Sequence, residues 1–175
     1  MNTPPTSQEK GVVLKGIITA WILSIIFVGS GYLAAQKFQF FQDWALYKTV
    51  AFAGLCSGLA LAAGIGWAAR IRHLISNIDG SSPQPNSALD ITLRYISNTV
   101  EQSVLFVISC AAFGVTFPEI SRYLLPVMSL WFLIARSLFW IGYVRSPLKR
   151  ATGFAATFHP TLVLLFAALI GMVIL

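Results

Sequence analysis

The chain has 175 residues, of which 57% are hydrophobic and 10% are charged, and its mean hydropathy is +0.76. This composition lies far outside that of soluble domains and predicts an integral membrane protein built only from α-helices. A net charge of +6 would suggest nucleic-acid binding in a soluble protein, but the basic residues here flank long apolar runs, where they set membrane topology. We therefore exclude nucleic-acid binding.

The first apolar run, residues 16–35, carries no charge and is long enough to cross a bilayer, which takes about 20 residues. Small residues near its end, Ala34 and Ala35, also fit a cleavable signal peptide, but the run exceeds the ~7–15 apolar residues of such a signal. We interpret it as a transmembrane helix. The aromatic connector that follows, residues 36–48, is typical of a segment at the level of the lipid headgroups.

The second predicted span, residues 49–69, has a small residue at every fourth position: Gly54, Gly58, Ala62 and Gly66. On a helix these positions form one flat face, which lets a second helix approach closely. The face therefore predicts helix packing, either within the chain or between copies of it.

The third span, residues 90–113, places Arg94, Asn98 and Glu101 in an otherwise apolar segment. Their spacing of i, i+4 and i+7 puts them on one narrow face of a helix. A charged side chain inside the bilayer is costly unless it faces a protein interior or a water-filled cleft. This face is therefore the first candidate site.

The fourth span, residues 123–144, has a second polar face, formed by Arg136, Trp140 and Tyr143 at the same spacing. Helix rise places Arg136 and Glu101 at similar depths in the membrane. A buried ion pair between these two residues is the simplest interpretation of both charges. The alternative is a site for an external ligand.

The fifth span, residues 151–175, is free of charge, and five spans put the chain termini on opposite sides of the membrane. The positive-inside rule then places the N-terminus in the cytoplasm and the C-terminus on the opposite side. Basic residues on the side predicted as cytoplasmic are Lys10, Lys15, Arg70, Arg72, Arg94, Arg145, Lys149 and Arg150. Compactness and the lack of an organelle signal favour the bacterial plasma membrane.

The surplus of positive charge near the third and fourth spans favours an anionic partner. Topology and contact with lipid headgroups explain the cluster of Arg145, Lys149 and Arg150 equally well. The two cysteines, Cys56 and Cys110, lie inside apolar segments without metal-type spacing, so we expect buried thiols, no disulfide and no metal site.

Two motifs connect these polar faces: Arg94-x-x-x-Asn98-x-x-Glu101, and Gly142-Tyr143 followed by Arg150-x-x-Gly153-Phe154. In order and separation they resemble the family of membrane-associated proteins in eicosanoid and glutathione metabolism (MAPEG). The resemblance covers residues 49–175 and implies a four-helix transmembrane domain there. Residues 1–48 would then be an N-terminal tail, an extra transmembrane helix and the connector.

The resemblance implies a homotrimer that binds glutathione between subunits near the cytoplasmic side. It makes Arg94 a carboxylate clamp, Asn98 a hydrogen-bonding ligand and Glu101 the acceptor for the ammonium group. Arg136 would contact a carboxylate, and Tyr143 would add a further polar contact. These assignments suit glutathione, because it has two carboxylates, an ammonium and a thiol.

Arg150 matches the family's arginine at the thiol, and we take it as the catalytic residue. A guanidinium beside a thiol favours the thiolate, which is the nucleophile. The implied activity is a glutathione transferase or peroxidase, with glutathione as co-substrate and small apolar electrophiles or lipid hydroperoxides entering from the bilayer. Arg70 or Arg72 could close the site from the loop.

One departure from the family is Phe139, where some members have a tyrosine whose hydroxyl is missing here. Some members of the family bind lipids without catalysis, so a noncatalytic membrane binding protein is the main alternative. A transporter subunit that uses Arg136 and Glu101 in an ion path is a third hypothesis.

Overall fold

The computed structural model describes residues 6–77 and 79–174, which form five α-helices and, within those ranges, no strand. The helices are α1 (Ser7–Lys37), α2 (Leu46–Leu74), α3 (Ala88–Thr116), α4 (Pro118–Arg145) and α5 (Arg150–Ile174). Each is long and apolar enough to span a membrane, which confirms the predicted all-α membrane bundle.

Local capping residues explain why several helices begin before the apolar runs do. The Thr6 hydroxyl accepts a hydrogen bond from the backbone N–H of Glu9, and the Glu9 carboxylate accepts one from the backbone N–H of Thr6. The Ser87 hydroxyl caps α3 by accepting a hydrogen bond from the backbone N–H of Asp90, and Pro118 occupies the first turn of α4. The helices therefore extend several residues beyond the predicted spans.

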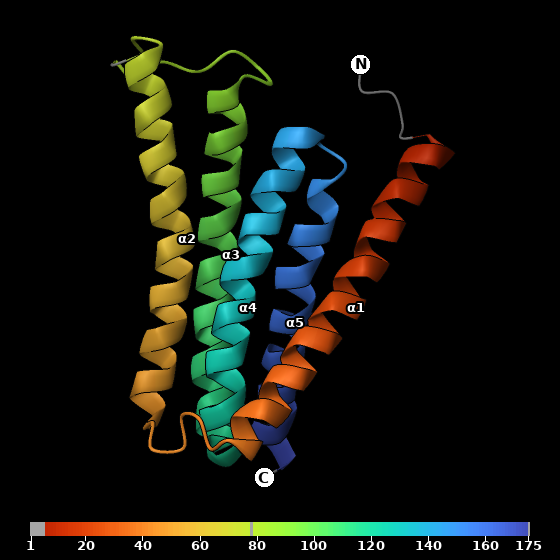
Figure 1. The fold of residues 1–175 in the computed structure, drawn as a ribbon, viewed down its shortest axis with the longest axis vertical. Helices are drawn as coiled ribbons and strands as arrows, with labels where there is room; N and C mark the ends of the chain where they lie inside the picture. The colour runs from red at the N-terminus through yellow and green to blue at the C-terminus, as the bar shows by residue number, and fades with distance from the viewer. Residues whose placement is uncertain (1–5, 78, 175) are drawn as a thin grey trace.

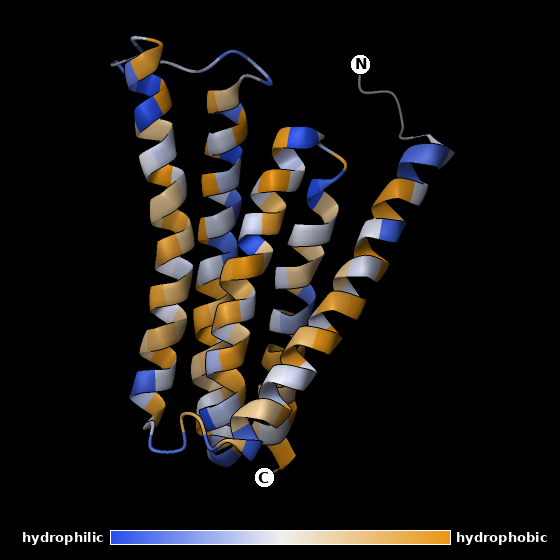
Figure 2. Ribbon diagram, in the orientation of Figure 1, coloured by the Kyte–Doolittle hydropathy of each residue, from blue (hydrophilic) through white to orange (hydrophobic). Residues whose placement is uncertain are grey.

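The five helices run side by side and alternate in direction (Figure 1). The start of α1, the α2–α3 loop and the α4–α5 turn lie at one end of the bundle, which we call the N-terminal end. The C-terminus lies at the other end, as five spans predict. Figure 2 shows hydrophilic residues along α3 and at the end and near the middle of α4 in the half toward the N-terminal end, while the opposite half of both helices is mainly apolar.

The apolar half of the bundle has a packed core between α3, α4 and α5. Phe106 stacks on Phe132 with ring centroids 4.6 Å apart and an interplanar angle of 18°. Cys110 is buried in the same cluster, and Cys56 is buried in α2. Both cysteines are free, which confirms the prediction of buried thiols without a disulfide between them.

Helix α1 is anchored to α4 and α5 through a buried tryptophan. Pro160 has no backbone N–H, so the carbonyl of Ala156, four residues earlier, has no helical partner. The indole N–H of Trp131 donates to this carbonyl at 2.9 Å and approaches the Ser24 hydroxyl of α1 at 3.1 Å. Ala20 is fully buried beside Trp131. The first predicted span is therefore an integral helix of the bundle.

Helix α2 packs on α3 at a glycine outside the predicted face. A Cβ at Gly64 would lie 2.7 Å from the Tyr95 ring, so this position accepts only glycine without rearrangement. In contrast, a Cβ at Gly54, Gly58 or Gly66 would have no described atom within 4 Å. The predicted small-residue face is therefore open in the single chain.

Candidate functional site

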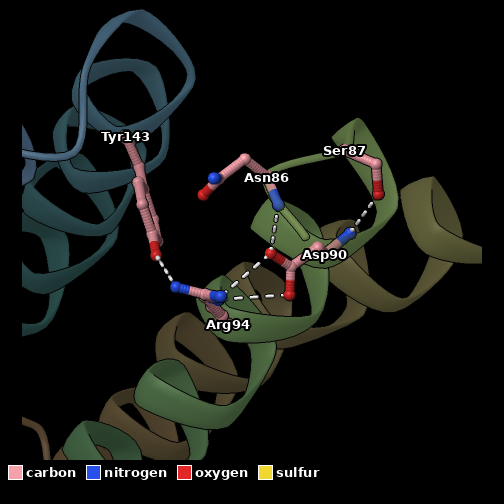
Figure 3. A network of polar contacts seen from close by, with 5 residues as sticks. All are labelled: Asn86, Ser87, Asp90, Arg94 and Tyr143. Carbon is pink, nitrogen blue, oxygen red and sulfur yellow. Dashed lines mark hydrogen bonds and ion pairs between the residues drawn. The ribbon is translucent and has the colours of Figure 1, made fainter. Parts of the chain in front are cut away.

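The first turns of α3 fix the position of Arg94 (Figure 3). Ser87 caps the helix, and the backbone N–H of Asn86 donates to the Asp90 carboxylate at 2.7 Å. Asp90 in turn forms an ion pair with Arg94, at 3.0 Å between Oδ2 and Nη2. The remaining Nη1 of Arg94 points to the hydroxyl of Tyr143 on α4, at 3.5 Å. Asp90 thus holds one side of the guanidinium and directs its other side toward α4.

Two glycines allow α4 and α5 to approach closely across their turn. A Cβ at Gly142 would lie 2.6 Å from the carbonyl oxygen of Lys149. A Cβ at Gly153 would overlap the backbone of Phe139. Both glycines belong to the second motif. Their lack of a side chain lets the chain reverse tightly enough to bring the start of α5 beside the end of α4.

This reversal places Arg150 over the ring of Tyr143, with 4.7 Å between the guanidinium carbon and the ring centroid. Tyr143 is buried, and its hydroxyl faces Arg94. One tyrosine therefore contacts both arginines. In the described part of the chain, Asp90 is the only carboxylate in an ion pair with either of them, so this corner keeps net positive charge.

Arg136 lies deeper, fully buried between α3 and α4. Its Nη1 donates to the Asn98 side-chain oxygen at 3.0 Å, and its Nη2 donates to the Thr99 hydroxyl at 2.9 Å. The ring of Phe139 lies 4.2 Å from the guanidinium carbon. All three partners are neutral. Phe139, which stands where some family members have a tyrosine, thus places its ring face against a buried cation.

The direct ion pair between Arg136 and Glu101, one of the two interpretations of their charges, is absent from the described residues. Because Arg136 donates to the Asn98 oxygen, the Asn98 NH₂ group must face the other way, and it approaches the Glu101 carboxylate at 3.5 Å. Asn98 therefore bridges the buried cation and the exposed acid. Among the described residues, this long contact with Asn98 is the one hydrogen bond of the Glu101 carboxylate, so most of its acceptor capacity is free.

A cleft of about 360 Å³ lies at this corner, between the start of α1, the α3 face and the α4–α5 turn. Its polar and apolar walls come from Arg94, Asn98, Arg150, Val13, Phe139, Pro147, Leu148, Ala151 and Phe154. The volume falls in the lower part of the range of small-molecule sites, roughly 300–1,000 Å³. The cleft combines two cations and an amide with apolar surface, so it suits a small anion that also has an apolar part.

Three of the six predicted site residues, Arg94, Asn98 and Arg150, line this cleft. Tyr143 lies beneath the two arginines, Arg136 lies behind Asn98, and Glu101 is one turn farther along α3 and exposed. The six therefore form two groups, Tyr143 with its two arginines and Asn98 with Arg136 and Glu101, and both groups reach the same cleft. The Arg136 guanidinium donates its hydrogen bonds to two side chains of the protein, those of Asn98 and Thr99.

Arg70 and Arg72, which could close the site, lie in the last turns of α2 and do not line the cleft within the single chain. Arg70 stacks over the Trp67 ring, with its guanidinium carbon 5.4 Å from the centroid, and Arg72 donates to the Asn77 side-chain oxygen at 2.8 Å. Sequence reasoning also overlooked Asp90 as the residue that orients Arg94. The signal was present, since an acid four residues before a base is a favourable helical pair.

Comparison with known proteins identifies the family of the chain. A segment of 82 residues is 26% identical to Transmembrane protein 79 of Mus musculus. The match covers 47% of this chain and 21% of the mouse protein, so this chain spans about a fifth of that relative's length. No solved structure matches. The sequence model of the MAPEG family matches residues 46–170, from the first residue of α2 into the last turns of α5. The chain therefore belongs to the MAPEG family, with α1 in addition to the matched helices.

Proposed function

We propose that this protein is a glutathione-dependent membrane transferase or peroxidase and that the cleft binds glutathione. The observation that supports it most is that Arg94 and Arg150 contact the same tyrosine, Tyr143, and line one cleft of suitable size. Family membership adds support, because both arginines stand in the motifs that resemble the family's.

The chemistry of the cleft corresponds to the groups of glutathione. Arg94, held by Asp90, presents free N–H donors to a carboxylate, the strongest pairing available to a guanidinium. Asn98 presents its NH₂ group, and Glu101 accepts a hydrogen bond from the ammonium. Arg136 contributes from behind by fixing the orientation of the Asn98 amide.

Arg150 is the catalytic residue in this proposal. A free thiol has a pKa of about 8.5, so at neutral pH only a few per cent is thiolate. The Arg150 guanidinium stabilises the thiolate, and the proton goes to water. In conjugation the sulfur forms a bond to an electrophilic carbon while the leaving group departs with its electron pair. With a hydroperoxide, the sulfur forms a bond to the terminal oxygen as the O–O bond breaks, which gives a sulfenic acid and an alkoxide that takes a proton from water to become the alcohol. A second glutathione thiol then attacks the sulfenic sulfur, and the products are the disulfide and water.

The test is the ultraviolet absorbance of the glutathione thiolate bound to detergent-purified protein. We expect a thiolate signal in the wild type, its loss in Arg150→Ala and partial recovery in Arg150→Lys. Arg145→Ala is the matched control, because Arg145 is also basic and exposed but does not line the cleft. Binding without thiolate or turnover would instead support a noncatalytic binding protein.

We also propose a homotrimer, with the N-terminal end of the bundle in the cytoplasm. The open face of Gly54, Gly58, Ala62 and Gly66 supports contact between copies, because small residues let helices pack closely in lipid. The concentration of basic residues at the N-terminal end supports the orientation. Gly58→Leu should reduce the mass of the protein–detergent complex, and a reporter fused to the C-terminus should lie outside the cytoplasm.

A further inference from the structure

We infer that an apolar groove between α1 and the α4–α5 turn binds the apolar part of the acceptor substrate. The inference rests on the proposed function and extends it, because it assigns the second substrate to a groove formed mainly by α1, which lies outside the part of the chain that matches the family, residues 46–170. Its basis is the geometry around Val13 and Leu148.

The groove has a volume of about 320 Å³ and apolar walls formed by Val13, Leu14, Ile17 and Leu148. Val13 and Leu148 also line the glutathione cleft. The two spaces are therefore neighbours that share a wall of two side chains. A ligand in the groove is therefore separated from the cleft that Arg150 lines by only these two side chains.

Gly16 fixes the position of α1 relative to Arg150. A Cβ at Gly16 would lie 3.0 Å from the Thr152 hydroxyl oxygen and 3.5 Å from the Ala151 Cβ, so α1 rests on the two residues that follow Arg150. Val13 lies about one turn before Gly16 on α1 and Ile17 directly after it. The close contact at Gly16 thus holds both groove residues beside the proposed catalytic arginine.

The occupant must be apolar, because the side chains along the groove are aliphatic and the charged ones, Glu9 and Lys10, stand at its outer end. The Glu9 carboxylate is already bonded to Thr6. Leu14 is 58% exposed, so the groove is open along α1 and accessible to an apolar electrophile. The substrate class is therefore an electrophile with an alkyl chain, whose reactive carbon reaches the thiolate while the chain lies against α1.

A homologous series of α,β-unsaturated aldehydes tests this assignment. Leu14→Trp fills the groove and should raise KM for long-chain aldehydes about tenfold, the scale set by one or two lost apolar contacts. Glutathione binding and the turnover of the shortest aldehyde should stay unchanged. Ile18→Trp is the matched control, because Ile18 is 51% exposed and does not line the groove. Equal effects on short and long aldehydes would overturn the inference.

A second measurement does not depend on turnover. A long-chain aldehyde with a photoreactive group at its tail should label the segment around Val13 to Ile17 or Leu148, and excess unlabelled aldehyde should compete. Labelling of other segments would overturn the proposal. Competition only by bulk phospholipid would also overturn it, because it would assign the groove to a membrane acyl chain. If the wild type does not bind glutathione but the aldehyde still labels α1, the result would contradict the proposed function and leave the groove assignment intact.

Discussion

The contact between α3 and α4 has two halves of opposite character. Away from the N-terminal end, Phe106 and Phe132 stack in an apolar core that includes Cys110 and Leu125. Toward the N-terminal end, the same two helices enclose Arg136 among neutral hydrogen-bond partners. The first half needs only packing to be stable, whereas the second half contains a charge whose burial is costly. The costly half is the one that adjoins the cleft.

The buried guanidinium has no carboxylate partner among the described residues, and its Nε has no hydrogen-bond partner there either. An apolar residue of similar size would fill this position without the desolvation penalty. Arg136 therefore contributes something other than stability, and its contact with Asn98 indicates what: it orients an amide that lines the cleft. The comparison predicts that stability and binding respond separately in the two halves.

The largest effect on stability should come from the apolar half. Phe132→Ala removes one partner of the stacked pair and leaves a cavity, which costs about 3–5 kcal/mol of unfolding free energy in packed cores. Unfolding by denaturing detergent measures this loss. Glutathione affinity of the protein that remains folded should be unchanged. A proportional loss of affinity would show that the two halves are not separable.

The next effect concerns Thr99, which accepts a hydrogen bond from Arg136. Thr99→Val keeps the shape but leaves a buried charged donor unpaired, at a cost of about 1–3 kcal/mol. Arg136→Met removes the donor itself and should leave unfolding free energy within about 1 kcal/mol of the wild type or raise it. Its glutathione affinity should nevertheless fall about tenfold, because Asn98 loses its orientation. Normal affinity in Arg136→Met would contradict the positioning role.

The smallest effect should come from the partly exposed ion pair of Asp90 and Arg94, whose side chains are 16% and 52% exposed. Asp90→Asn removes the charge that holds Arg94. We expect no measurable change in stability and a loss of about two- to threefold in glutathione affinity, the usual range of exposed pairs. The difference from the wild type should shrink in high salt, because exposed charges are screened. A large loss of stability would mean that Asp90 has a structural role.

Much of the fold followed from composition and helical periodicity, because a bilayer imposes helix length and hydropathy so strongly. Periodicity also identified the polar faces that carry Arg94 and Arg136. It did not identify the true partner of Arg136, since Asn98 and Glu101 are only about 4.5 Å apart along the helix axis, less than one turn. The reach of the Arg136 side chain decides whether it contacts Asn98 or Glu101, and a depth estimated from the sequence is too coarse to distinguish the two residues.

The contribution of Val13 to the cleft was also beyond sequence reasoning. It depends on how α1 rests on α5, and that contact is set by Gly16, Thr152 and the bonds of Trp131 to neighbouring helices. Such contacts join residues far apart in the chain, and a single sequence has no periodic signal for them. The role of Asp90, in contrast, is local and was readable from its spacing to Arg94.

Equilibrium binding of labelled glutathione to the purified protein tests the central claim most directly. We predict saturable binding by the wild type at millimolar concentration or below. The double variant Arg94→Ala and Arg150→Ala should bind at least about a hundredfold more weakly, because two lost charged hydrogen bonds at about 1.5–3 kcal/mol each sum to about 3 kcal/mol or more. Thermal unfolding would establish that both proteins are folded. Absence of saturable binding by the wild type, or equal affinity of the two proteins, would contradict the account.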